Sequence, residues 1–596
     1  MDTNMEKSTS VYELLMDKST AALADQMRHF LTEGHVCIHW EALEPEVRVL
    51  LPPPTSWPSN PWMSPWDQQR NTPFVYMDGY VYFHRYWHYE TQIIHGINRL
   101  LQTSLPLPPT AELHNVVWQL FEEESMDERN IAPLIALLHS FRYAFTLITG
   151  GPGTGKTTSI ARILAAHLSI RPHLRIALAA PTGKAANRMG EAIQQVVGHL
   201  QLRDEVRQSI RDIPQFTVHR LLGFSPLTLQ FAHNASNPLP YDMLVVDEAS
   251  MMDVVLFAHL MEALPEQIQL IVVGDRHQLA SVEAGLVFGD LCTAAMPFDC
   301  YSEEDRAFYR QFIPAFDRLV RSDTPDEREG PLLMGHAIEL KYSHRFDPHR
   351  GIGRFSNLVL SGQLTAAEIV EEFVAPPEGA ELIVLPQWDE ALLVELLEPY
   401  RNYVHEEAVD AAWQRLHALR ILCAVNEGPL GVHALNALVE AHLQEEGLIE
   451  VRSPYYHRQP ILITKNDYSL GLYNGDVGIV RYDEERERYL AYFKRRDEEG
   501  MVFYPASVIK DFQTTYAMTI HKSQGSEYDQ VIIVLPEDAE HPLLTRELLY
   551  TAVTRARHRV YLFARPEVLE AAVQRHTRRM SGLSYRLRHR NTNLTE

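Results

Sequence analysis

Apolar runs and amphipathic runs alternate regularly between residues 130 and 285. Short runs rich in Val, Ile, Leu and Ala lie at 144–149, 174–179, 243–246 and 270–273, separated by longer segments that include helical patterns. Strands of a parallel sheet are joined by helical crossovers and buried on both faces. The pattern therefore predicts a doubly wound α/β domain, which we place at residues 116–335.

A second α/β pattern occupies residues 336–450 and 511–596. Its expected strands include 421–425 and 531–535, and a helix is expected at 549–557. Residues 451–510 break the pattern with short strand-like runs and the turn Asn474-Gly475-Asp476. We interpret them as a small β-barrel inserted into the second domain.

Residues 1–115 lack this alternation. They contain five of the eight tryptophans and a proline-rich stretch between 52 and 65, so a separate and mainly helical N-terminal domain is expected. Such a surface fits the ordinary packing of a small domain. It fits a partner-docking module equally well, because aromatic residues are enriched at interfaces.

A phosphate-binding loop follows the first strong strand. Residues 150–158 read Gly-Gly-Pro-Gly-Thr-Gly-Lys-Thr-Thr and complete the pattern G-x-x-x-x-G-K-[ST]. Glycines let backbone N–H groups turn toward phosphates, and the helix that begins near Lys156 adds its positive dipole end. ATP and Mg²⁺ are the expected ligands, with Lys156 on the β- and γ-phosphates and Thr157 on the metal. The nucleotide-binding residues are Gly150, Gly151, Pro152, Gly153, Thr154, Gly155, Lys156, Thr157 and Thr158.

Further polar residues follow two of the other apolar runs. Asp247 and Glu248 come directly after residues 243–246, at the strand end where open α/β sheets place their chemistry. Asp247 is expected to hold Mg²⁺ and Glu248 to orient or deprotonate the attacking water. Gln278 is placed to sense the γ-phosphate. The structural alternatives are a solvated turn for the acidic pair and a strand-end amide for Gln278.

Arg345 and Arg555 lie in the second α/β segment. Arginine is always charged and forks onto phosphate oxygens, so both are candidate partners for a γ-phosphate held by the first domain. A nucleotide between two α/β domains would close the cleft when bound and release it after hydrolysis. This is the organisation of a motor.

Charge and cysteine content narrow the functional classes. The chain carries 54 Lys and Arg against 78 Asp and Glu, a net charge of −24, which excludes bulk electrostatic coating of nucleic acid. Any DNA contact must be local or completed by a partner. The four cysteines have no C-x-x-C spacing, so no zinc site or disulfide framework is indicated. With no apolar run long enough to span a membrane, a cytoplasmic protein is expected.

The ordered motifs resemble those of superfamily 1 DNA helicases. They lie at Lys156, 181–184, 247–250, 274–281, 343–346, 519–527 and 550–557, and their wording is most similar to the alpha subunits of exodeoxyribonuclease V, the RecD family of bacterial RecBCD complexes. The resemblance implies two RecA-like P-loop domains, an SH3-like barrel and a 5′-to-3′ ATP-dependent translocase that unwinds DNA ends for recombinational repair. It also implies RecB-like and RecC-like partner subunits, one of them docked on the N-terminal domain.

The same resemblance implies a path for single-stranded DNA. Hydroxyl, imidazole and ammonium donors suit phosphate contacts that ignore base sequence. For each residue the alternative is a local cap or loop hydrogen bond. The expected DNA-binding residues are Pro181, Thr182, Thr217, His219, Thr519, His521 and Lys522.

Other interpretations remain open at this point. A stand-alone helicase of the related type would keep every motif, and a regulatory DNA-binding module with a decayed ATPase is a second alternative. Asp326 with Glu339 and Lys341 spells a nuclease-like pattern, which we do not expect to be functional because short motifs recur by chance. A hairpin at residues 226–241 is the candidate strand-separating wedge, and an arginine-rich tail at 575–590 is expected to be solvated.

Overall fold

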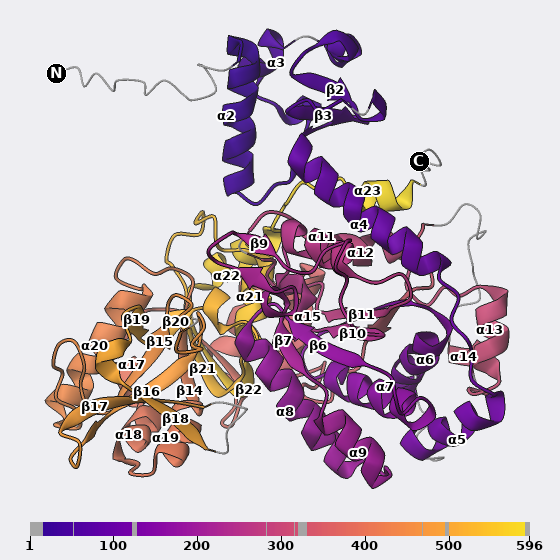
Figure 1. The fold of residues 1–596 in the computed structure, drawn as a ribbon. Coiled ribbons are helices and arrows are strands. Elements are labelled where there is room, and N and C mark those ends of the chain that lie inside the picture. Colours follow the sequence, from indigo (N-terminus) through magenta and orange to yellow (C-terminus); the bar gives the residue numbers. More distant parts are fainter. Residues whose placement is uncertain are drawn as a thin grey trace.

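A computed structural model of the chain describes residues 16–589, except 52, 69, 122–127, 282, 315, 320–330, 468 and 495–499. Two parallel sheets form two α/β domains that lie side by side (Figure 1). An antiparallel sheet extends the second domain, and a small N-terminal domain lies on the first. The predicted α/β class with parallel sheets is confirmed. No helix in the described residues is long and apolar enough to cross a membrane.

The first sheet has the strand order β12-β5-β11-β10-β6-β7, and all its neighbouring strands are parallel. β12 was expected in the second domain, since we placed the boundary at residue 335. It pairs instead with β5, because an apolar run does not specify which strand it will join. The strands are β5 (Phe145–Gly150), β6 (Ile176–Ala180), β7 (Gln215–Thr217), β10 (Met243–Val246), β11 (Gln269–Gly274) and β12 (Ala337–Leu340).

Helices cover both faces of this sheet. Successive strand residues point to opposite faces, so Leu244 packs into one core and Val245 into the other. The first core includes α4 (His84–Gln102), α10 (Val218–Leu221), α11 (Val254–Ala263) and α12 (Val287–Ala295). The second includes α5 (Thr110–Phe121), α6 (Glu128–Arg142), α7 (Lys156–Ile170), α8 (Gly183–His199), α9 (Asp204–Arg211), α13 (Glu303–Arg310) and α14 (Phe316–Leu319).

The second parallel sheet has the order β13-β22-β21-β14-β20. Its strands are β13 (Leu382–Leu385), β14 (Leu419–Cys423), β20 (Ala517–Thr519), β21 (Tyr528–Val534) and β22 (Ala556–Phe563). Its helices are α15 (Gly351–Ser361), α16 (Ala366–Ile369), α17 (Glu390–Glu395), α18 (Glu398–His405), α19 (Val409–Leu416), α20 (Val432–Glu445), α21 (Arg546–Val553) and α22 (Pro566–Gln574).

The inserted segment is an antiparallel sheet of order β18-β17-β16-β15-β19. Ile461, Val480 and Phe493 from three of its strands share a small core separate from the parallel sheets. The strands are β15 (Gln459–Ile463), β16 (Val477–Asp483), β17 (Arg488–Lys494), β18 (Met501–Pro505) and β19 (Phe512–Thr514). The insertion therefore runs slightly past the expected end at residue 510.

The N-terminal domain combines helices with a four-stranded sheet of order β1-β4-β3-β2, so it is not the mainly helical domain that was expected. The strands are only three or four residues long, so a period-two pattern has little length in which to show. The elements are α2 (Lys18–Thr32), β1 (Cys37–His39), α3 (Pro45–Leu50), β2 (Met63–Pro65), β3 (Phe74–Met77) and β4 (Tyr80–Phe83). α4 continues from this domain and packs on α11 of the first α/β domain (Figure 1).

Two further elements differ from expectation. The expected wedge hairpin at 226–241 is shorter and earlier, with β8 (Phe224–Ser225) antiparallel to β9 (Gln230–Phe231). The tail was expected to belong with the second sheet. Its last helix, α23 (Leu583–Arg588), instead packs on α12 and α4 of the first core (Figure 1).

Candidate nucleotide site between the two parallel sheets

The phosphate-binding loop connects β5 to α7. Gly153 and Gly155 have φ angles of +75° and +85°, which a side chain would strain. The Lys156 Nζ atom donates to the carbonyl oxygens of Gly150 and Gly151 at 2.7 and 3.0 Å. Phosphate oxygens are stronger acceptors for an ammonium than neutral carbonyls. The loop geometry and the lysine therefore fit a polyphosphate.

Asp247 and Glu248 follow β10 as predicted. Asp247 is buried, and its Oδ1 atom accepts a hydrogen bond of 2.8 Å from the Glu248 amide. Burial and the neighbouring Glu248 raise the pKa of Asp247, while Lys156 opposes the shift. Glu248 has a φ of +51°, an uncommon conformation for a non-glycine residue that often marks functional sites. A cation bound at this position would favour the ionised Asp247.

Gln278 lies after β11 and is buried with Asp275. Its Nε2 atom donates to Asp275 Oδ2 at 3.0 Å, and its Oε1 atom is buried without a hydrogen-bond partner. The same Asp275 oxygen accepts a 3.1 Å bond from the Tyr550 hydroxyl of the second domain. A Cβ atom placed on Gly151 would lie 2.8 Å from that hydroxyl, so Tyr550 reaches the phosphate-binding loop.

Leu279 joins the two domains through both of its backbone polar groups. Its amide donates to Thr551 Oγ1 at 2.9 Å, and its carbonyl accepts from Gln524 Nε2 at 2.8 Å. Both partners belong to the second domain. The segment after β11 is therefore hydrogen-bonded to the second domain on both sides of Leu279.

Arg345 is held at the edge of the loop by its own segment. Ser343 Oγ donates to the Pro152 carbonyl at 3.2 Å, and the His344 amide donates to the Gly153 carbonyl at 2.8 Å. The Arg345 Nη2 atom binds Glu527 at 2.8 Å, while its Nη1 atom is buried without a partner. The predicted arginine is thus next to the loop, with its guanidinium on a carboxylate.

Arg555 is buried in the second domain. Its Nε atom donates to the Thr551 carbonyl at 3.1 Å and its Nη1 atom to the Ser526 carbonyl at 3.3 Å. These bonds tie α21 to the segment before β21. They fix the position of Arg555 within its own domain.

Three of the predicted DNA-contacting residues, all threonines, make the local cap or loop hydrogen bonds that were given as the structural alternative. Thr182 caps α8 and Thr217 caps α10, each by accepting from a backbone amide at 3.2 Å. Thr519 Oγ1 accepts from the Lys522 amide at 3.3 Å. A capping hydroxyl retains a free lone pair and can rotate, so these bonds leave the DNA role as a prediction.

Two of the remaining four are histidines. Burial lowers the pKa of His219, whose ring packs edge-on to Phe224, and it lowers the pKa of His521. Both imidazoles are thus biased toward the neutral form. Pro181 directly precedes the Thr182 cap at the end of β6.

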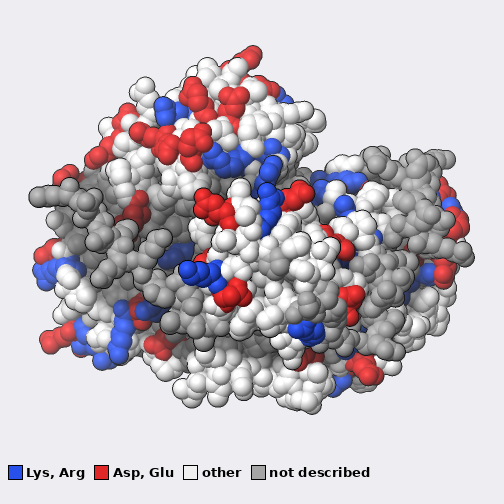
Figure 2. All heavy atoms as spheres, turned by 90° about the horizontal axis from the view of Figure 1, so that it is seen from above, with Lys and Arg blue, Asp and Glu red and all other residues white. Residues whose placement is uncertain are grey.

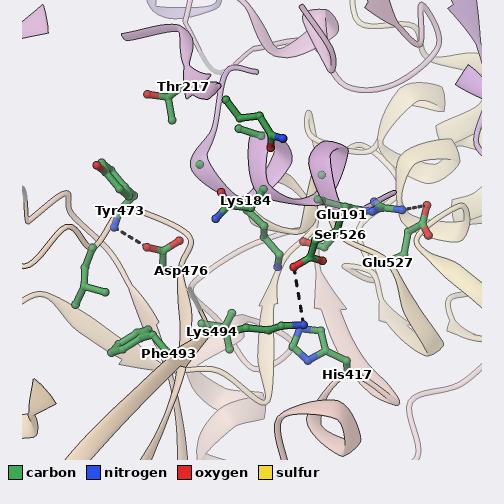
Figure 3. Close-up of a pocket in the computed structure, with 18 of the residues that line it drawn as sticks. Lys184, Glu191, Thr217, His417, Tyr473, Asp476, Phe493, Lys494, Ser526 and Glu527 are labelled. Atoms are coloured by element: carbon green, nitrogen blue, oxygen red, sulfur yellow. Dashed lines mark hydrogen bonds and ion pairs between the residues drawn. The ribbon is translucent and has the colours of Figure 1, made fainter. Parts of the chain in front are cut away.

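A cleft of about 970 Å³ lies where the two α/β domains and the inserted sheet meet. Figure 3 shows Lys184 and Thr217 from the first domain facing Tyr473 and Asp476 of the insertion. Among the residues predicted to contact DNA, only Thr217 lines this cleft. The sequence did not indicate this three-way junction.

Several residues that contribute to the site were not singled out in the sequence. Tyr550, Thr551, Ser343 and Asp275 fall inside recognised motifs, but nothing in the local pattern showed their contacts. Arg188 lies outside the motifs and gave no signal. The described residues contain no group of three or more His, Cys, Asp or Glu that could hold a metal. Mg²⁺ needs only one or two protein ligands beside phosphate oxygens, so Thr157 and Asp247 suit it.

Comparison with known proteins decides the family. Residues 135–284 match the AAA domain model and residues 514–563 the UvrD-like helicase C-terminal domain model. The chain is 36% identical to RecBCD enzyme subunit RecD of Mycobacterium tuberculosis, covering 90% of this chain and 85% of the relative. The chain belongs to the RecD family. RecBCD enzyme subunit RecD of Mycolicibacterium smegmatis is 35% identical, with coverage of 94% and 92%.

A more distant relative is the ATP-dependent RecD2 DNA helicase of Deinococcus radiodurans. It is 30% identical over 78% of this chain, and the match spans 52% of the relative. A solved Bacteroides Pif1 structure bound to single-stranded DNA matches 77% of this chain and 93% of that chain at 17% identity, with a TM-score of 0.34.

Proposed function

We propose that this RecD-family chain is an ATP-dependent DNA helicase that translocates 5′ to 3′ on single-stranded DNA. One observation carries the proposal: the phosphate-binding loop of the first sheet is contacted directly by the second domain. Tyr550 of the second domain reaches Gly151, and Ser343, in the segment that leads from β12 to the second domain, bonds to Pro152. A nucleotide at this loop would touch both domains, so binding and hydrolysis would change their relation.

The roles of the site residues follow from their positions. The loop amides and Lys156 would hold the phosphates, and Thr157 with Asp247 would hold Mg²⁺, which supplies positive charge for the developing negative charge when bound. Glu248 would orient or deprotonate the attacking water. Gln278, with its unpartnered Oε1 atom, would respond to the γ-phosphate, while Arg345 and Arg555 would stabilise its charge.

The domains receive matching roles. The two α/β domains would be RecA-like motor domains, and the inserted sheet would be an SH3-like barrel beside the DNA path. The N-terminal domain would dock on a RecC-like subunit in a complex that also holds a RecB-like subunit and processes DNA double-strand ends. On the face shown in Figure 2, acidic and basic side chains intermingle, and the described residues form no continuous basic band. Partner subunits that supply part of the DNA path would make the net charge of −24 compatible with DNA binding.

The test is unwinding of duplexes that carry either a 5′ or a 3′ single-stranded tail, with Lys156→Gln as the inactive control. We expect unwinding from the 5′ tail only and none by the variant. Unwinding from the 3′ tail would overturn the polarity. If single-stranded DNA stimulates ATP hydrolysis but no duplex is unwound, the chain is an active motor that needs its partner subunits to unwind DNA. The assay would then be repeated with the reconstituted complex.

The same assays separate the alternatives. Efficient unwinding by the isolated chain, with no subunits recovered alongside it from native lysate, would favour a stand-alone helicase. Nucleotide binding without DNA-stimulated hydrolysis would favour a regulatory module. No nuclease role is proposed for Glu339 and Lys341, which pair with Arg276 and Asp299; Asp326 lies outside the described residues.

A further inference from the structure

Glu527 joins three arginines that come from three different segments. It binds Arg188 of α8, Arg345 of the segment after β12 at 2.8 Å, and Arg557 of β22 at 3.4 Å. Figure 3 shows its carboxylate within the cleft between the domains, joined to an arginine of the first domain. Burial would raise the pKa of Glu527, but Arg188 and Arg345 hold it at about 2. The carboxylate is therefore ionised at any working pH.

The cluster contains more positive than negative charge. Arg188 and Arg345 bind the same oxygen, Oε1 of Glu527. Asp529 adds one further carboxylate, 3.6 Å from Arg557. Because the Arg345 Nη1 atom is buried without a partner, this guanidinium is incompletely satisfied. An incoming polyanion would therefore compete effectively for Arg345.

The backbone of Arg345 is already in place for such an exchange. The neighbouring His344 amide is bonded to the Gly153 carbonyl, and a Cβ atom on Gly153 would lie 2.5 Å from the Arg345 Cβ. Only the guanidinium end points away, toward Glu527. Rotation of one side chain would bring it to the loop without moving a strand.

We propose that Glu527 is the counter-ion that holds Arg345 while no nucleotide is bound, and that the γ-phosphate of ATP takes Arg345 from it. The inference rests on the proposed ATP site. Once Arg345 leaves, Arg188 is the one arginine still bound to Oε1 of Glu527. Since Arg188 lies in the first domain and Glu527 in the second, nucleotide binding would strengthen a bridge between them. Glu527 is thus a positioning residue that couples nucleotide occupancy to domain closure.

The test measures binding of a fluorescent non-hydrolysable ATP analogue and of fluorescent ADP. Glu527→Gln keeps the side-chain volume and removes the competing charge. We expect the ATP analogue to bind about two- to fivefold more tightly, the range that one ion pair supplies, with ADP affinity unchanged. Asp529→Asn is the matched control, because Asp529 contacts Arg557 but not Arg345, and it should leave both affinities unchanged.

Two more variants keep the test decisive. Arg188→Gln leaves Glu527 to Arg345 and should weaken ATP-analogue binding, the opposite direction. In an Arg345→Ala background, Glu527→Gln should no longer change nucleotide affinity, because the two effects act through one contact. Unchanged or weaker ATP-analogue binding by folded Glu527→Gln would overturn the inference. Failure of the wild type to bind any nucleotide would overturn the proposed function itself.

Discussion

Glu90 on α4 and Arg586 on α23 form an ion pair of 3.4 Å, although 496 positions separate them in the chain. Their side chains are 0% and 3% exposed. The Glu90 carboxylate also accepts from Ser581 Oγ at 2.9 Å and from the Gly582 amide at 3.1 Å. A buried charge must be paired and hydrogen-bonded to be tolerated. The C-terminal segment is thus tied to the N-terminal part of the molecule.

Four arginines of this tail, Arg575, Arg579, Arg586 and Arg588, bind within the chain, which corrects the expectation of a solvated end. Arg575 donates to the His541 and Leu544 carbonyls of the second domain, and Arg579 donates to the Glu283 and Gly285 carbonyls of the first. Arg588 donates to the Thr293 carbonyl of α12. The segment therefore connects the second domain, the first domain and α4.

Gly582→Ala should destabilise this connection. A Cβ atom at Gly582 would lie 1.6 Å from the buried Tyr82 hydroxyl, so the segment or the tyrosine must move. We expect a loss of about 1–3 kcal/mol in unfolding free energy, seen as a Tm lower by several degrees. Gly198→Ala is the control, since nothing lies within 4 Å of its Cβ position. Equal Tm values for the two variants would contradict this account of the tail.

Asp290 of α12 should make stability depend on pH near neutrality. Burial raises its pKa to about 7, with Glu90 also raising it and Ser581 and Ser584 opposing the shift. Arg586 and the buried Cys37 and Tyr82 are the other titratable groups around Glu90 and Asp290. A carboxyl with a raised folded pKa contributes stability that is lost as pH rises through that pKa.

The measurement is Tm between pH 5 and pH 8 for the wild type and for Asp290→Asn, because the loss occurs between the unfolded pKa and the folded pKa of about 7. We expect the wild-type Tm to fall over this interval and the variant Tm to fall less, because its amide cannot ionise. A steeper decline in the variant would show that Asp290 is ionised and stabilising in the folded state.

Thr551→Val should uncouple the two domains while leaving each folded. The variant removes the acceptor of the Leu279 amide, which costs about 1–3 kcal/mol when that buried group stays unpaired. We expect DNA-stimulated ATP hydrolysis to fall about tenfold. Thr554→Val is the control, because Thr554 bonds only to carbonyls of its own helix. Similar hydrolysis rates in both variants would argue against coupling through Leu279.

The hairpin β8–β9 should separate strands without driving translocation. Its tip carries Leu227 and Leu229, which are 96% and 75% exposed, so replacing them does not disturb a core. Replacing both with Asn should reduce unwinding of tailed duplexes and spare ATP hydrolysis on single-stranded DNA. Leu107→Asn, at another exposed leucine, is the control. Equal loss of unwinding and hydrolysis would remove the hairpin from the wedge role.

The sequence alone determined the local chemistry. The phosphate-binding loop, the carboxylates after β10 and the class of both sheets depend on consecutive residues, whose glycine positions and apolar periods are readable in order. The same local character explains why Thr182 and Thr217 could be located but not assigned to DNA or to a cap.

Only the tertiary structure decided which distant groups meet. The pairing of β12 with β5, the reach of Tyr550 to Gly151 and the sharing of Glu527 by Arg188 and Arg345 leave no periodic trace in the sequence. An arginine's charge acts over a few ångströms in space, and many carboxylates along the chain would suit it equally well. Its partner is set by how the sheets and the C-terminal segment pack, which is a property of the whole fold.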